Sequence, residues 1–496
     1  MTDKEAIKAQ HDKGKLTARE RIELLLDKNS FTELDELAEL SSSNYGLQEK
    51  KKPGDGVITG YGRINNKPVC IFAQDFTFMG GSMGEMHNLK IAKMQEHALK
   101  IGCPVIGLFD SGGARIQEGI HGLDGGGKIF KNNTLASGVI PQISVILGPC
   151  AGIAVYSPAL TDFIFMVKNV SNMFITGPDV IKSVTGEQID FQGLGGANIH
   201  NEKSGVAHFI SKDEKECLQM VKLLLSYLPQ NNMENPGQIS VKDSPTRSNP
   251  ILEKLVPKDS KKVYDVKKVI QEVVDRNTFM EVQPLYAQNA VVGFARLNSI
   301  AIGIVANQPS VLAGCLDINS SGKIARFVRF CDNFSIPIIN FVDVTGYLPG
   351  VDQEHSGIIR HGAKVLYAYS EATVPKISLV MRKAYGGAYI AMVSKDMGYD
   401  KVIAWPNAEI AVMGAEQAVN IIHRKELQGK NANKIKEQRV KEYKEKFLNP
   451  YEAAKHGKVD IITEPKNTRR VLISCLEMLL NKRERRPSKK HGNMPL

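Results

Sequence analysis

Runs of apolar residues along the chain predict buried strands alternating with amphipathic helices. Residues 57–63 and 69–72 follow the alternating pattern of two strands, and residues 85–100 have helical periodicity. The apolar run 104–109 predicts a buried strand, and residues 4–27 predict a pair of amphipathic helices at the N-terminus. Strands that alternate with helices indicate an α/β fold.

Two predicted strands end at glycines and continue directly as helices. Residues 375–380 form an apolar strand that leads to Gly386 and Gly387 and then to a helical segment. Residues 140–146 lead in the same way into the segment 148–154. Such a junction directs several unpaired backbone N–H groups at one point, which suits negative charge developing on a carbonyl oxygen. One Gly-Gly pair is weak evidence because ordinary turns also use glycine, but its recurrence favours two oxyanion sites.

The two turns belong to a repeat that spans most of the chain. Similar residues recur 233 positions apart (Ala73 and Ala306, Gly81 and Gly314, Pro104 and Pro337, Asp110 and Asp343) or 234 apart (Pro141 and Pro375, Gly152 and Gly386). A repeat of this length indicates a duplicated domain rather than a solenoid. Prolines clustered between positions 229 and 257 indicate a linker, so the sequence predicts domains at 1–235 and 250–496.

Composition and charge are those of an ordinary globular protein. Of the 496 residues, 42% are hydrophobic and 24% charged. The net charge of +11 is concentrated in residues 424–446 and 481–496, which read as one charged helix and a tail. Such segments are more often solvated surfaces than nucleic-acid grooves, so we do not expect nucleic-acid binding.

Membrane segments, export signals and metal sites are not predicted. No apolar run is long enough for a transmembrane helix, and the polar first thirty residues do not resemble a secretory signal, so we expect a cytoplasmic protein. The seven cysteines include no Cys-x-x-Cys pair and mostly lie in apolar runs. They are predicted to be buried, reduced thiols and not metal ligands.

A second candidate binding site follows the predicted strand 104–109. It is the segment Asp110–Gly119, which includes Ser111, Gly112, Gly113, Ala114 and Arg115 and whose glycines at a strand end could hold phosphate or thioester oxygens. The alternative is a tight turn in which Arg115 pairs with Glu118 on a helix. The residues are equally compatible with both interpretations.

Several stretches resemble biotin-dependent acyl-CoA carboxyltransferases. They are Gly14–Arg21, Pro53–Val57, Ser111–Gly119, Leu135–Pro141, Leu316–Ser321, Ala404–Pro406 and His491–Leu496. The resemblance covers nearly the whole chain. It is greatest to the β subunit of propionyl-CoA carboxylase, and the α subunit of sodium-pumping methylmalonyl-CoA decarboxylase is a close relative.

The resemblance implies a fold and a set of site residues. The fold would be a duplicated pair of crotonase-like (ClpP/crotonase) carboxyltransferase domains, assembled as a homo-hexamer, a trimer of dimers. One oxyanion hole would lie at the amides of Gly152 and Ile153 and the other at Gly387 and Ala388, one for a thioester enolate and one for the ureido oxygen of biotin. The implied substrate-binding residues are Ser111, Gly112, Gly113, Ala114, Arg115, Tyr156 and Ile390.

The implied activity is transfer of a carboxyl group from carboxybiotin to the α-carbon of propionyl-CoA, with acetyl-CoA as a second candidate. The chain has neither a Met-Lys-Met biotin-attachment sequence nor an ATP-grasp glycine loop. The implied partners are therefore separate biotin carboxylase and biotin carboxyl carrier subunits. Two alternatives stay open: the α subunit of a sodium-pumping methylmalonyl-CoA decarboxylase, and a non-catalytic scaffold that binds acyl-CoA.

The sequence departs from the family pattern at Ile153, at Thr345 and in the segment 121–127, which differs from the usual one. Ile153 stands where the family usually has glycine, and a β-branched residue cannot easily adopt a positive φ. We therefore expect a less regular first oxyanion hole. Thr345 stands where proline is common. Ile390 occupies a position at which the family varies between Asp and Ile, and an apolar residue there is compatible with both propionyl-CoA and acetyl-CoA.

Overall fold

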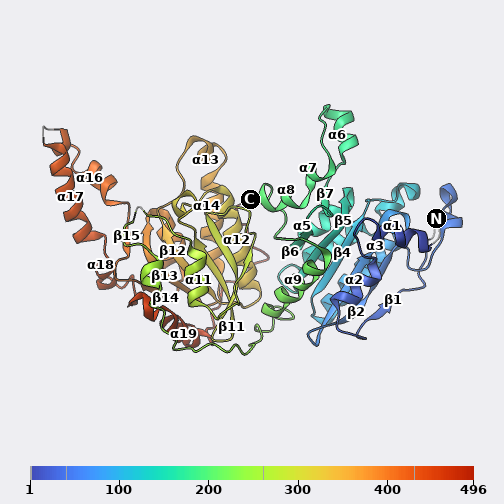
Figure 1. Cartoon of the computed structure of the whole chain (residues 1–496), viewed down its shortest axis with the longest axis horizontal. Helices are drawn as coiled ribbons and strands as arrows, with labels where there is room; N and C mark the ends of the chain where they lie inside the picture. The colour runs from blue at the N-terminus through green and yellow to red at the C-terminus, as the bar shows by residue number, and fades with distance from the viewer. Residues whose placement is uncertain (1–2, 41, 261, 429–430, 496) are drawn as a thin grey trace. The chain divides into compact units, whose positions relative to one another are not determined.

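The chain forms two compact units (Figure 1). The computed structural model describes residues 3–40, 42–260, 262–428 and 431–495. The first unit comprises Met1–Asn235 with Gln283–Tyr286, and the second comprises Pro236–Val282 with Ala287–Leu496. The first long segment thus ends at residue 235, and residues 236–257 of the segment expected to be a linker belong to the second unit.

The first unit is built on one mixed sheet with the strand order β1-β2-β3-β4-β5-β6-β8, and β7 pairs with β5. Strands β1 to β3 are antiparallel, and the remaining pairs are parallel. The strands are β1 (Thr32–Leu34), β2 (Val57–Ile64), β3 (Lys67–Gln74), β4 (Val105–Ser111), β5 (Gln142–Ala151), β6 (Phe163–Val167), β7 (Asn172–Phe174) and β8 (Phe209–Ser211). The three strands predicted between residues 57 and 109 are therefore confirmed.

The helices of this unit begin with the predicted N-terminal pair. They are α1 (Asp3–His11), α2 (Ala18–Leu25), α3 (Glu85–Ile101), α4 (Gly126–Ala136), α5 (Tyr156–Leu160), α6 (Pro178–Thr185), α7 (Phe191–Gly195), α8 (Ala197–Glu202) and α9 (Glu214–Tyr227). Helix α3 is the one predicted at residues 85–100, and it packs on β2, β3 and α4. All residues of β4 are buried, as expected of a central parallel strand covered on both faces.

The second unit repeats this sheet, with the order β16-β14-β13-β12-β11-β10-β9 and β15 paired with β13. Its strands are β9 (Met280–Val282), β10 (Ala290–Leu297), β11 (Ile300–Asn307), β12 (Ile338–Val344), β13 (Lys376–Tyr385), β14 (Lys401–Ala404), β15 (Glu409–Ala411) and β16 (Ile461–Ile462). Its helices are α10 (Leu252–Leu255), α11 (Val266–Val273), α12 (Ile318–Asn333), α13 (Val351–His355), α14 (Ile358–Glu371), α15 (Gly386–Met392), α16 (Ala415–Ile422), α17 (Ala432–Phe447), α18 (Pro450–Lys455) and α19 (Thr468–Leu479).

The duplication extends to strained backbone positions. Gly81 and Gly314, 233 residues apart, both have a positive φ, of 62° and 73°. A Cβ atom at Gly81 would lie 2.1 Å from the carbonyl oxygen of Asp110, and one at Gly314 would lie 2.6 Å from that of Asp343. Only glycine fits at either position, which explains why the repeat keeps these glycines.

A buried lysine is repeated as well. Lys90 on α3 donates to the carbonyl oxygens of Gly54 and Val57 at 2.9 and 2.6 Å. Lys323 on α12, 233 residues later, donates to the carbonyl of Ala290 at 2.8 Å. In both units the ammonium ties the first long helix to the start of a strand, so the duplicated fold includes a polar contact that the hydrophobic pattern does not reveal.

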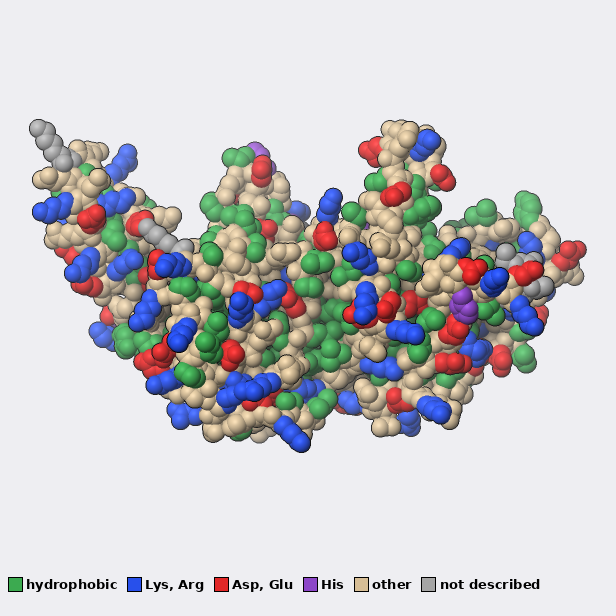
Figure 2. All heavy atoms as spheres, viewed as in Figure 1, with side chains coloured by type: hydrophobic (Ala, Val, Ile, Leu, Met, Phe, Trp, Pro, Cys, Tyr) green, Lys and Arg blue, Asp and Glu red, His purple; other side chains and the backbone are tan. Residues whose placement is uncertain are grey.

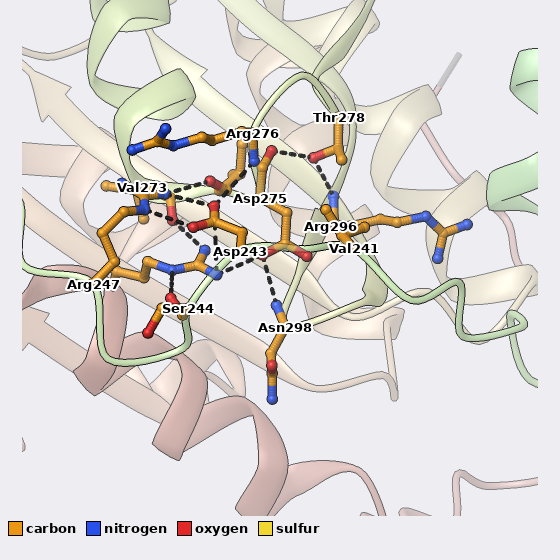
Figure 3. Close-up of polar contacts among 12 residues, drawn as sticks. Val241, Asp243, Ser244, Arg247, Val273, Asp275, Arg276, Thr278, Arg296 and Asn298 are labelled. Atoms are coloured by element: carbon orange, nitrogen blue, oxygen red, sulfur yellow. Dashed lines mark hydrogen bonds and ion pairs between the residues drawn. The ribbon is translucent and has the colours of Figure 1, made fainter.

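The segment predicted as a linker is held by ion pairs (Figure 3). Arg247 makes two hydrogen bonds to Asp243, at 2.8 and 2.9 Å. Arg469 on α19 lies 2.6 Å from Asp275 and donates to the carbonyl of Ser244. Because a buried carboxylate is stable only when it is paired, these contacts fix the segment to the second unit.

Surface features agree with the charge pattern of the sequence. Figure 2 shows Lys and Arg side chains over α17, which has no buried residue. Within the described part of the chain, every helix is too short or too polar to cross a bilayer.

The buried Lys323 gives the first testable prediction. Burial lowers its pKa from 10.5 to about 7, so above about pH 7 the folded chain releases a proton that the unfolded chain retains. The free energy of unfolding should therefore rise with pH because of this residue. We expect the difference in unfolding midpoint between wild type and Lys323→Met to grow in favour of wild type between about pH 7 and about pH 9.5.

Circular dichroism at a series of pH values measures this difference. Lys434→Met, which removes an exposed lysine of α17, is the control and should give a difference that does not change with pH. A pH-independent difference for Lys323→Met would contradict the prediction.

Candidate active site: two strand-to-helix turns

The first turn lies where β5 ends. Ala151 is extended, with φ −121° and ψ 152°, and Gly152 then reverses the chain with a φ of 59°. The one-turn helix η4 (Gly152–Val155) follows and leads into α5. The first two amides of a 3-10 helix have no intrahelical partner, so the N–H groups of Gly152 and Ile153 begin the turn as available donors.

The second turn repeats this geometry at the end of β13. Tyr385 is extended, with φ −115° and ψ 146°, and Gly386 has a φ of 56° before α15 begins. Gly386, Gly387 and Ala388 are the first three residues of that helix. Both turns are therefore built on one left-handed glycine followed directly by helix.

This geometry corrects the expectation for Ile153. The left-handed position is Gly152 in one turn and Gly386 in the other, and Ile153 lies outside that region. Ile153 can therefore present its amide without strain. The side chain that replaces the usual glycine packs against the core of the first unit instead of distorting the backbone.

The positions of the two left-handed glycines show which residues of the two turns correspond to each other. Gly152 corresponds to Gly386, so Ile153 corresponds to Gly387 and Ala154 to Ala388. The expected amide pairs, Gly152 with Ile153 and Gly387 with Ala388, are therefore offset by one residue. Gly152 and Ile153 therefore correspond to Gly386 and Gly387.

The segment Ser111–Arg115 lies against the first turn. Gly113 has a φ of 101°, and a Cβ atom there would be 2.9 Å from the carbonyl oxygen of Ala151. The backbone of this segment is anchored to Met83, which donates to the carbonyl of Gly113 at 2.8 Å. Gly112 and Gly113 thus border the turn, and the Gly113 amide donates to the buried Ser111 hydroxyl at 3.1 Å.

Arg115 is placed differently from what ligand binding would require. Its side chain is fully buried, and it lies 2.7 Å from Asp55 and 2.8 Å from Glu118. It also donates to the carbonyl and the hydroxyl of Ser82. This arrangement favours the alternative in which Arg115 holds the loop through Glu118, although Asp55 was not anticipated.

Tyr156 and Ile390 occupy equivalent exposed positions. Each lies four residues after the left-handed glycine of its turn, on α5 and α15, with 46% and 48% of the residue exposed. Tyr156 packs edge-on against Phe130. Both side chains are therefore available beside their turns.

The buried Asp110, at the start of the second candidate segment, forms ion pairs that the sequence does not predict. Asp110 ends β4 and is 2.7 Å from Lys15 and 2.9 Å from Arg21. Arg21 also donates to Glu214 of α9 and to the carbonyl of Leu147 in β5. Lys15 and Arg21 therefore attach the N-terminal segment to the strands next to the turn, which is the structural role of the stretch Gly14–Arg21.

Asp343 takes the same place in the second unit, with a different cation. Arg382 of β13 donates from Nε to Asp343 at 2.9 Å, and the amide of Lys383 donates to the other carboxylate oxygen at 3.3 Å. Burial raises the pKa of Asp343, while Arg382 and Lys383 act in the opposite direction. At the position equivalent to Arg382 the first unit has Gly148, where a Cβ atom would lie 2.5 Å from the Nζ of Lys15.

In the ranges that the structure describes, no three His, Cys, Asp or Glu side chains are grouped as a metal site would require. The described cysteines are all free thiols.

Comparison with known proteins places this geometry in context. A family model described as the carboxyl transferase domain matches residues 9–494. The methylmalonyl-CoA decarboxylase subunit alpha of Veillonella parvula is 57% identical over 99% of this chain and 95% of its own length. The propionyl-CoA carboxylase carboxyltransferase subunit of Haloferax mediterranei is 56% identical, again over 99% of this chain and 95% of its own length.

A solved structure agrees with the fold. Transcarboxylase 12S, described as a hexamer and solved with methylmalonyl-coenzyme A and methylmalonic acid bound, is 52% identical to this chain. The two superpose with a TM-score of 0.97, covering 99% of this chain and 94% of the other.

The two glycines of the second turn should respond oppositely to the same substitution. Gly386→Ala forces a left-handed alanine and brings its Cβ to 3.1 Å from the carbonyl oxygen of Val412, so it should destabilise the fold by about 1–2 kcal/mol. Gly387→Ala meets only the ring of Tyr347, at 3.7 Å, and should be neutral or stabilising by up to about 1 kcal/mol.

Thermal unfolding of the two variants beside wild type measures the contrast. Each variant is the control for the other, because both add one methyl group to the same turn. Equal shifts of the midpoint in both variants would show that the turn is not built on a left-handed Gly386.

Proposed function

The chain belongs to the carboxyl transferase domain family, and from that premise we propose that it transfers a carboxyl group between biotin on a separate chain and the α-carbon of a short acyl-CoA. The enzyme class is that of biotin-dependent acyl-CoA carboxyltransferases, and propionyl-CoA carboxylase β chains are among its relatives. The preferred substrate in this proposal is propionyl-CoA, with acetyl-CoA second.

Two equivalent turns carry the proposal: in each, a left-handed glycine leads from a parallel strand directly into a helix, so the first amides of the helix lie at the end of the sheet. Carboxyl transfer to a thioester needs stabilisation of two oxygens, the thioester carbonyl as its α-carbon becomes a nucleophile and the urea oxygen of the donor. A fold with two such turns has one for each. Backbone donors held by strands need little reorganisation as charge develops, which is the basis of their effect on rate.

The second turn fits the biotin donor. Gly387 is exposed and has no side chain, so a flat ring can approach its amide. The second donor of the proposal is the amide of Ala388, the buried residue that follows. When bound there, carboxybiotin would supply CO₂ and a nitrogen base for the α-proton of the thioester. The turn of Gly152 and Ile153, with Gly112 and Gly113 beside it, would then hold the thioester oxygen.

The relatives named as β chains or carboxyltransferase subunits of larger enzymes support separate partner chains. Biotin and its ATP-dependent carboxylation would be supplied by biotin carboxyl carrier and biotin carboxylase subunits. We also propose a homo-hexamer, a trimer of dimers, supported by the hexamer described for transcarboxylase 12S.

A second candidate function runs the same half-reaction in reverse. Methylmalonyl-CoA decarboxylase α subunits match the chain over nearly its full length, so decarboxylation beside a membrane pump subunit is the alternative. The same two turns would serve both directions. Ile390, apolar and exposed on α15, would contact the acyl chain or the biotin ring in either case.

Removing a single backbone donor tests the function of the second turn. Replacing Ala388 with lactic acid converts its amide into an ester and leaves the methyl side chain in place. Biotin-dependent decarboxylation of malonyl-CoA by the purified chain should then fall about 10²–10³-fold in kcat, the effect of losing one oxyanion donor. Binding of the CoA portion should change little.

Protein made by the same route with alanine at position 388 is the control. Activity of the ester variant close to that of this control would contradict an oxyanion role for the turn. If wild type shows no biotin-dependent turnover of malonyl-CoA or methylmalonyl-CoA, the non-catalytic acyl-CoA-binding scaffold is the better interpretation.

A further inference from the structure

The second unit has a pocket of about 450 Å³ beside its turn. Tyr385, which directly precedes Gly386, is in its wall, together with Thr345, Lys383, Glu409 and Lys444. These residues come from the end of β13, the loop after β12, β15 and α17. The pocket therefore borders the residue that leads into the turn.

Most charges in the wall already have partners within the second unit. Arg382 is bound to Asp343 and to the carbonyl oxygens of Asp259 and Lys262. Glu409 accepts a hydrogen bond from the Tyr385 hydroxyl and lies 3.8 Å from Lys444. The wall has four cations and two carboxylates, and Asp343 neutralises Arg382, which leaves an excess of one positive charge.

Two of the four cations, Lys262 and Lys383, have no side-chain partner among the described residues, and Lys383 is the less exposed of the two. Lys383 lies opposite Glu409 in the pairing of β13 with β15. Its ammonium nevertheless makes no hydrogen bond or ion pair with any residue that the structure describes. The residue is only half-exposed, and burial lowers its pKa, opposed chiefly by Asp343.

An unpaired ammonium in a half-buried wall costs desolvation energy that a bound anion would offset. The excess of a single positive charge matches a monoanion, such as a carboxylate, better than a diphosphate. Thr345 adds a hydroxyl donor to the same wall. The first unit has Pro149 at the position equivalent to Lys383, so this cation distinguishes the second turn from the first.

We infer that Lys383 binds the carboxylate of the group being transferred, while that group is on the acyl thioester or on its donor. The inference rests on the proposed function and assigns the pocket of the second unit to the carboxylate. In this arrangement the amides of the turn hold a carbonyl oxygen, and Lys383 holds the charged end of the transferred group. A cation there also favours carboxylated over uncarboxylated ligands.

Equilibrium binding to the full-length chain tests this assignment. Calorimetry would compare malonyl-CoA, which has the carboxylate, with propionyl-CoA, which lacks it, on wild type, Lys383→Met and Lys383→Arg. We expect Lys383→Met to weaken malonyl-CoA binding by about 10- to 100-fold, the usual worth of a hydrogen bond to a charged group. Propionyl-CoA binding should change less than about twofold, and Lys383→Arg should retain most of the affinity for malonyl-CoA.

Lys441→Met is the matched control, since it removes an exposed lysine of α17 that is outside the pocket wall. A second arm measures the KM for a carboxylated biotin carrier in the forward reaction. If Lys383→Met raises this KM and leaves malonyl-CoA binding unchanged, Lys383 binds the carboxylate while it is on the biotin donor, and the inference is also supported.

Three results would overturn the assignment. Equal weakening of malonyl-CoA and propionyl-CoA would point to the phosphates of CoA as the ligand of Lys383. If Lys383→Met lowers the unfolding midpoint and leaves ligand binding unchanged, the role of Lys383 is structural. If the affinities, the KM and the midpoint of Lys383→Met all equal those of wild type, Lys383 does not bind the carboxylate. The binding measurements need no turnover, so a failure of the proposed activity would be seen separately, in the biotin-dependent assay of wild type.

Discussion

Both turns depend on a buried aspartate paired with a cation at the end of the adjacent strand. A carboxylate out of water is tolerated only when it is neutralised and hydrogen-bonded, so every segment that contributes a partner is held in place. Asp110 forms ion pairs with Lys15 and Arg21 of the N-terminal segment. Arg21 in turn donates to Glu214 of α9 and to the carbonyl of Leu147 in β5, so these elements are linked to Asp110. Asp343 forms an ion pair with Arg382 of β13, and Arg382 also donates to the carbonyl of Lys262 in the loop before α11. The turns follow directly from the strands that these pairs hold.

The two units solve the same electrostatic problem with cations from different places. In the second unit the cation is Arg382, on the strand that carries the turn. In the first unit Gly148 takes that position, and the room it leaves is filled by Lys15 from the N-terminal segment. Both units have the aspartate and the left-handed glycine, but the cation that neutralises the aspartate comes from a different position in each. The second turn also has a lysine where the first has a proline.

The hydrophobic pattern and the positions of the glycines predicted the central strands, the helix α3 and both strand-to-helix junctions, because the periodicity of apolar residues and the placement of glycines are local properties of the sequence. The repeat was predicted from residues that recur 233 or 234 positions apart. Contacts across long sequence distances were not predictable in this way. The partner of Arg115 in the core, Asp55, lies 60 residues away, and the partners of Asp110 lie about 90 residues away. The concern about Ile153 failed for a related reason: the sequence shows which residues form the turn, but the structure shows which of them adopts the left-handed conformation.

The most direct test of this account is hydrogen–deuterium exchange of the peptide that contains residues 383–390. In Arg382→Met the carboxylate of Asp343 loses its cation, so the turn should loosen and its amides should exchange faster than in wild type. Adding Asp343→Asn removes the unpaired charge but keeps an oxygen that can accept from the amide of Lys383, so slow exchange should largely return in the double variant. If Arg382→Met leaves exchange of this peptide unchanged, the aspartate–cation pair does not hold the turn, and the central claim is wrong.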